Sequence, residues 1–103
     1  PSVLTNMIPS IEQHVDWIAD CIDHMRSHDK SRIEAEAEAE EAWVEHVNEV
    51  GDLSLRATCQ SWYFGSNIPG KPRGGLPYSG GFPVYVRKCD EVAANGYSGF
   101  ALS

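Results

Sequence analysis

The side chains best suited to chemistry gather in one Gly- and Pro-rich stretch, residues 61–73, which reads SWYFGSNIPGKPR. Trp62 offers a flat face and one N–H donor, so it can cover a ring or hydrogen-bond a ribose hydroxyl while excluding water. Lys71 and Arg73 add positive charge that suits a phosphate-bearing ligand. The stretch therefore predicts a loop that contacts a nucleotide. The alternative is an aromatic anchor with a purely structural role.

No other part of the sequence holds a self-sufficient catalytic set. P-loop, GxSxG and HExxH patterns are all missing from the sequence. Asp20, His24 and His28 are spaced one turn apart on a predicted helix and could hold a metal, but such a trio is more often solvated. The acidic run at residues 34–49 is likewise typical of a solvated helix surface. We predict no metal site.

Composition excludes several classes of protein. The 103 residues carry a net charge of −7, concentrated in the first half, and this acidic face would repel the phosphates of nucleic acid. Cys21, Cys59 and Cys89 are too far apart for a metal motif and odd in number, which favours a reducing, cytoplasmic location. No apolar run is long enough to span a membrane. Because the chain begins at Pro1, we expect it to be part of something longer.

Two helices are predicted to position the loop from its N-terminal side. The first begins at Ser10 with a capping box and carries an apolar stripe, comprising Ile11, Val15, Ile18, Ile22 and Met25. The second begins at Ser31 and includes EAEAEAEEA at residues 34–42. This run alternates like a strand, but Ala and Glu favour helix. Gly51 is a plausible stop. The two helices, residues 10–50, are predicted to pair as an antiparallel hairpin.

Residues 51–82 are predicted to form a long loop, because Gly and Pro are too frequent there for a regular element. A third helix is predicted over residues 83–94, with Pro83 in its first turn and Asn95-Gly96 ending it. Its inward face would carry Tyr85, Cys89 and Val92. A short strand is expected to follow, so residues 83–103 form a C-terminal helix and strand. The predicted fold is α-rich.

The stretch SWYFGSNIPGKPR resembles the mobile control loop of the Baeyer–Villiger monooxygenases. PSVLTNM, SIEQHVDWI, EEAWVEHVNEV and CDEVAANGYSGF resemble the closing portion of the same family, in the same order. The likeness is greatest to the phenylacetone, cyclopentanone and steroid monooxygenase branch and extends over the whole chain. It implies that residues 1–103 complete the α/β FAD-binding domain of a flavoprotein with two dinucleotide domains, and that residues 51–82 are its mobile loop.

The resemblance also implies an activity. Members of the family use FAD, NADPH and molecular oxygen to insert oxygen next to a ketone, giving an ester or lactone. The dinucleotide fingerprints and the catalytic arginine of the family lie upstream, so we expect no catalytic residue among residues 1–103 and no activity from this chain alone. Its partners would be the upstream FAD and NADP domains of the same protein.

The resemblance assigns roles by position. Trp62 matches a tryptophan that bonds the NADP ribose, Lys71 supports the closed loop, and Met7 approaches the flavin. The residues that match the substrate pocket are Ser2, Val3, Leu4 and Leu76. Relatives carry bulky residues where Gly74-Gly75 stand, which predicts a looser or wider loop exit. Two other functions remain open: an acidic helical interaction module without catalysis, and a flavin-dependent sulfide or amine oxygenase.

Overall fold

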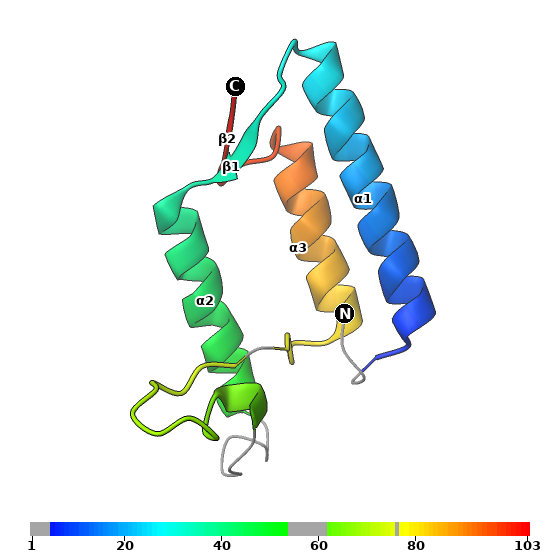
Figure 1. The fold of residues 1–103 in the computed structure, drawn as a ribbon. Helices are drawn as coiled ribbons and strands as arrows, with labels where there is room; N and C mark the ends of the chain where they lie inside the picture. The colour runs from blue at the N-terminus through cyan, green and yellow to red at the C-terminus, as the bar shows by residue number, and fades with distance from the viewer. Residues whose placement is uncertain (1–4, 54–61, 76) are drawn as a thin grey trace.

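The computed structural model describes residues 5–53, 62–75 and 77–103. It contains three helices, a short 3₁₀ turn and a two-stranded sheet, in the order α1 Met7–Ser27, β1 Ile33–Ala35, α2 Ala37–Asp52, the 3₁₀ turn Trp62–Phe64, α3 Phe82–Ala94 and β2 Phe100–Leu102. Figure 1 shows α3 between α1 and α2, with the small sheet at one end of the helices and the Gly/Pro-rich loop at the other. The predicted third helix and terminal strand are confirmed.

The first helix begins one turn earlier than the sequence predicts. Asn6, not Ser10, is the N-cap, and its side-chain oxygen accepts a hydrogen bond from the Ile8 N–H at 3.2 Å. Pro9 is tolerated because it lies in the first turn, where its missing N–H is not needed. Ser10 is instead buried, and its hydroxyl donates to the Asn6 carbonyl at 2.9 Å.

The predicted pairing of the first two helices, residues 10–50, is wrong. α1 packs against α3, and the Trp17 Nε1 atom of α1 donates to the Cys89 carbonyl of α3 at 2.9 Å. On the same side, the rings of His14 and Tyr85 lie 5.3 Å apart. The physical reason is that α3 offers aromatic and aliphatic side chains, whereas the first turns of α2 offer only Ala and Glu.

The second helix also begins later than predicted, because its expected first turns form a strand. Residues 33–35 pair antiparallel with β2, in the register Ile33 with Leu102, Glu34 with Ala101 and Ala35 with Phe100. The Ser31 and Arg32 N–H groups both donate to the Ser103 carbonyl at 2.8 Å. Pairing with a segment far along the chain satisfies these backbone groups and overrides the helix propensity of Ala and Glu. The predicted start of the second helix at Ser31 is therefore wrong.

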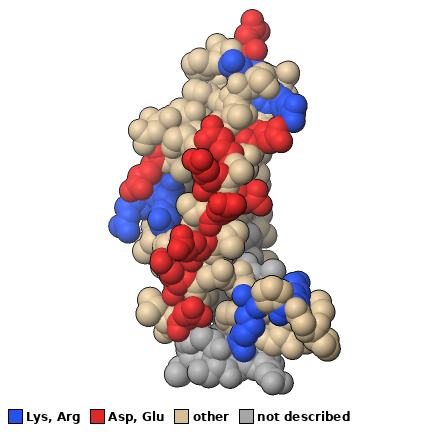
Figure 2. Space-filling view, turned by 90° about the vertical axis from the view of Figure 1, so that its left-hand side faces the viewer, with Lys and Arg blue, Asp and Glu red and all other residues tan. Residues whose placement is uncertain are grey.

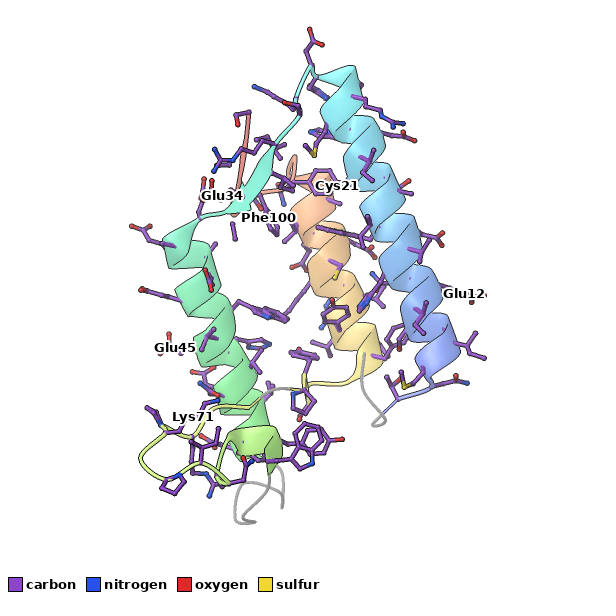
Figure 3. All side chains as sticks on the ribbon, viewed as in Figure 1. Glu12, Cys21, Glu34, Glu45, Lys71 and Phe100 are labelled. Carbon is purple, nitrogen blue, oxygen red and sulfur yellow. The ribbon has the colours of Figure 1, made fainter. Side chains whose placement is uncertain are left out.

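The main core lies between α1, the end of α3 and the sheet. Its buried members are Cys21, Met25 and Tyr97, and Trp17, Val92 and Phe100 pack against them. Figure 3 shows Cys21 of α1 and Phe100 of β2 in this region. Burial raises the pKa of the Cys21 thiol and of the Tyr97 phenol above their usual values, so both groups are held neutral.

A second packing centre joins α2 to α3 through aromatic rings. Trp43 of α2 stacks on Tyr78 with ring centroids 5.3 Å apart, and His46 Nε2 lies 3.1 Å from the Tyr78 hydroxyl. Tyr85 of α3 completes the group, with its ring 5.6 Å from that of Tyr78. Burial, with a smaller contribution from Cys89, raises the pKa of Tyr85 to about 12. α3 therefore contacts α1 on one side and α2 on the other. These contacts set the position of α2, and of the loop that follows α2, relative to α3.

Replacing Trp17 with alanine is expected to lower the free energy of unfolding of the protein by about 3 kcal/mol, the lower end of the cost of removing a core tryptophan. The change removes the bond to the Cys89 carbonyl and the edge-on contact with Tyr97, whose ring centroid lies 5.2 Å away. Urea unfolding of the protein that carries this chain would measure the loss. Glu12→Ala, at an exposed position of the same helix, is the matched control, and equal stability of the two variants would contradict the prediction.

No helix in the described part of the chain is long and apolar enough to cross a membrane.

Candidate functional site

The candidate loop presents one aromatic side chain outward and one inward. In the 3₁₀ turn Trp62–Phe64, the Trp62 side chain is 60% exposed, whereas Phe64 is only 7% exposed. The Trp62 indole stacks on the ring of Tyr63 with centroids 4.1 Å apart, so one face of the indole is supported by the protein. This arrangement leaves the indole available to a ligand and uses Phe64 as the anchor.

Phe64 packs against the last turns of α2. A β-carbon placed on Gly51 would lie 3.6 Å from Phe64 Cε1, which is ordinary contact distance. Gly51 itself is buried within α2, which ends at Asp52, one residue beyond the predicted stop. The small residue at this position instead lets the phenyl ring lie close to the helix.

The exit of the loop is held by two hydrogen bonds that backbone N–H groups donate. The Gly74 N–H donates to the Phe64 carbonyl at 3.2 Å, which closes the loop at its base. The Gly75 N–H donates to the side-chain oxygen of Asn48, on α2, at 2.8 Å. Arg73 lies over the Phe64 ring, with its guanidinium carbon 5.4 Å from the centroid. Gly74 and Gly75 thus each donate a hydrogen bond, and the looser or wider exit expected from them stays a prediction.

Lys71 folds back over the start of the loop. Its side chain passes so close to Gly65 that a β-carbon there would lie 3.2 Å from Lys71 Cδ and 3.7 Å from Nζ. Gly65 also has a φ of 68°, a conformation that favours glycine. Figure 3 shows Lys71 on the loop beside the lower end of α2. The ammonium group and the indole of Trp62 are thus carried by the same loop.

Charge separates along α2. Figure 2 shows acidic side chains in a column along the helix, with Lys and Arg side chains gathered over the loop beyond its lower end. The acidic residues on the exposed surface of α2 are Glu38, Glu40, Glu41, Glu45, Glu49 and Asp52. An anionic ligand is repelled by this column and favoured at the loop, where Lys71 and Arg73 lie.

The structure places Met7 apart from the loop. Met7 is exposed in the first turn of α1, and Figure 1 places the start of α1 at the same end of the helices as the loop. Four predicted pocket residues, Ser2, Val3, Leu4 and Leu76, lie outside the described residues. Among the predicted site residues that the structure describes, Trp62 and Lys71 therefore lie on the same loop.

The three residues considered as metal ligands do not form a group that could hold a metal ion in the described part of the chain. The rings of His24 and His28 stack with centroids 4.2 Å apart, and His28 Nδ1 lies 2.8 Å from the His24 carbonyl. Among residues 5–53, 62–75 and 77–103, no group of three His, Cys, Asp or Glu side chains could hold a metal ion.

Comparison with known proteins gives a consistent set of relatives, although no family model matches the chain. The acetone monooxygenase (methyl acetate-forming) of Gordonia sp. strain TY-5 is 48% identical over 102 residues, 99% of this chain and 19% of the relative. A Baeyer–Villiger monooxygenase of Pseudooceanicola batsensis is 39% identical over 91% of this chain and 17% of its own length. A phenazine N-monooxygenase of Lysobacter antibioticus is 40% identical over 98% of this chain and 19% of its own length.

A solved structure shows the same arrangement of elements. Oxidised steroid monooxygenase bound to NADP superposes with a TM-score of 0.88 at 42% sequence identity, over 99% of this chain and 19% of that one. The chain therefore spans about a fifth of the length of the proteins that it matches.

Proposed function

Because the chain belongs to the Baeyer–Villiger monooxygenase family, we propose that it forms the C-terminal part of the FAD-binding domain of an NADPH- and FAD-dependent enzyme. The proposed reaction inserts an oxygen atom next to a ketone and gives an ester or lactone. One observation carries the proposal for this chain's own role. Trp62 is 60% exposed on a loop whose base is fixed to α2, so its indole is positioned to meet a ligand.

The loop has the chemistry that a nicotinamide dinucleotide requires. The exposed Trp62 indole supplies an N–H donor for a ribose hydroxyl, and its ring supplies a flat cover that keeps water out. Lys71, held over Gly65 on the same loop, supplies positive charge for a phosphate. Exposed Met7 is proposed to contact the flavin. Bound FAD and NADPH would supply the electrons and the oxygen activation.

The substrate pocket is proposed to include Ser2, Val3, Leu4 and Leu76, on the strength of the family resemblance. The ketone would be small or cyclic, in keeping with relatives whose names specify acetone, cyclopentanone and cyclohexanone. No residue of the chain is proposed to be catalytic. Its contribution is to position the dinucleotide and to line the pocket.

The rest of the same protein is the proposed partner of α1. A stripe of aliphatic side chains on this helix is exposed in the structure, namely Ile11, Val15, Ile18 and Ile22. An exposed apolar stripe of this kind indicates a surface that other residues cover. With relatives about five times as long as this chain, the missing residues are proposed to come from the upstream domains.

Product analysis of the whole protein tests the proposed function. With NADPH, oxygen and cyclopentanone, we expect consumption of NADPH and formation of the ring-expanded lactone, whereas the isolated 103-residue chain should form no product. NADPH oxidation that yields no lactone or ester from cyclopentanone, cyclohexanone or acetone would argue against ketone oxygenation.

Nitrogen oxygenation is the second candidate, and one observation favours it. The phenazine N-monooxygenase relative is 40% identical over nearly the whole chain, close to the value for the Baeyer–Villiger monooxygenase relative. An N-oxide formed from phenazine, with no ester from ketones, would select this candidate. The acidic interaction module considered from the sequence finds no such support, because the relatives compared are monooxygenases.

A further inference from the structure

We infer that Asn48 is a positioning residue for the loop that carries Trp62, and that it acts by holding the loop exit against α2. Its side-chain oxygen accepts a hydrogen bond from the Gly75 N–H at 2.8 Å, across 27 residues of sequence, and so joins α2 to the loop exit. Asn48 is half-buried on α2 and next to the buried Val47, so its amide is fixed by the helix rather than by the loop.

The hydrogen bond to Asn48 links α2 to the Trp62 indole through a short series of neighbouring residues. Gly75 follows Gly74, whose N–H bonds to the Phe64 carbonyl, and Phe64 is only two residues from Trp62. A β-carbon on Gly75 would lie 3.7 Å from Phe64 Cε1, Val47 Cγ1 and the Val47 carbonyl, so the exit packs closely on both the anchor ring and the helix. Loss of the acceptor on Asn48 therefore frees the exit and lets the indole depart from its position.

This inference rests on the proposed function only where it concerns NADPH. The first measurement does not involve the cofactor. Trypsin can cut after Arg73, at the bond to Gly74 inside the anchored exit, whereas the bond after Lys71 is protected by the following Pro72. The rate of the cut after Arg73, followed by mass spectrometry of the whole protein, reports how often the exit detaches.

In the whole protein, Asn48→Ala is expected to speed the cut after Arg73 by roughly 2- to 10-fold, the change that corresponds to one ordinary hydrogen bond. Asn48→Asp keeps an acceptor oxygen in the same place and should leave the rate near that of the unmodified protein. Glu49→Ala, at the exposed neighbouring position, is the matched control and should have no effect. If Asn48→Ala does not fold, Asn48→Leu keeps the volume and removes the acceptor.

The second measurement concerns the dinucleotide. Asn48→Ala should raise the KM for NADPH by a similar factor, with kcat and bound FAD unchanged, and Asn48→Asp should restore the KM. An unchanged rate of cutting would overturn the inference. So would faster cutting with an unchanged KM for NADPH, provided that Trp62→Ala does raise that KM. If neither Asn48→Ala nor Trp62→Ala changes the KM although cutting accelerates, the proposed role of the loop in binding NADPH fails, and the anchoring role of Asn48 stands.

Discussion

Replacing Trp62 with alanine in the whole protein is expected to raise the KM for NADPH roughly 10- to 100-fold, equivalent to about 1.4–2.8 kcal/mol, while FAD stays bound. The change removes an N–H donor together with a flat aromatic surface that is 60% exposed in the structure. Because the indole is exposed and not part of the core, its removal should cost little stability. Steady-state kinetics with varied NADPH, together with the flavin absorbance of the purified protein, measure the two effects separately.

Trp62→Phe separates the two contributions of the indole. Phenylalanine keeps an aromatic face that can stack on Tyr63, as the indole does at 4.1 Å, but it lacks the N–H donor. We expect a KM for NADPH between those of the unmodified protein and Trp62→Ala. If Trp62→Ala loses FAD and NADPH in equal measure, or unfolds at a lower urea concentration, the tryptophan is a structural anchor and the proposed role of the loop is wrong.

The loop could be predicted from the sequence because local composition determines it. Six Gly and four Pro between residues 65 and 83 exclude a long helix or strand, and the turns at Gly65 and Gly70 both have positive φ in the structure. The third helix was predictable for a similar reason, since Pro83 lies in its first turn and Gly96 follows its end. Signals of this kind act over a few residues.

The predictions from the sequence are wrong where contacts between residues far apart in the chain determine the local structure or the packing of a helix. Residues 33–35 become a strand because residues 100–102 lie beside them, and no local pattern in EAEAEAEEA announces that partner. α1 packs on α3 rather than on α2 because of ring contacts such as His14 with Tyr85. The same limit applies to Asn48 in the site. From the sequence alone Asn48 is one of many polar residues of α2, and its hydrogen bond to the Gly75 N–H is seen only in the folded structure.

Introducing a charge on the exposed stripe of α1 is expected to have opposite effects on solubility in the two forms of the protein. It should lower the solubility of the whole protein and raise that of the isolated chain. Val15 and Ile18 are 57% and 53% exposed here, although aliphatic side chains of this size gain about 1.5–3 kcal/mol each when fully buried. In the isolated chain, Ile18→Asp should reduce aggregation, because it interrupts an exposed apolar stripe. In the whole protein, the same aspartate would be buried against the proposed partner surface without a counter-charge.

The cost of such an unpaired buried charge is at least several kcal/mol, enough to unfold many domains. We therefore expect Ile18→Asp in the whole protein to give mostly insoluble material, and any soluble fraction to have lost FAD. Asp16→Asn changes the charge of the same helix by the same amount at an exposed position outside the stripe, and should leave yield and flavin content unchanged. Normal yield and flavin content in Ile18→Asp would show that the stripe faces water in the whole protein. The upstream domains would then have to reach the loop without resting on α1, and the position proposed for Met7 beside the flavin, at the start of the same helix, would lose its support.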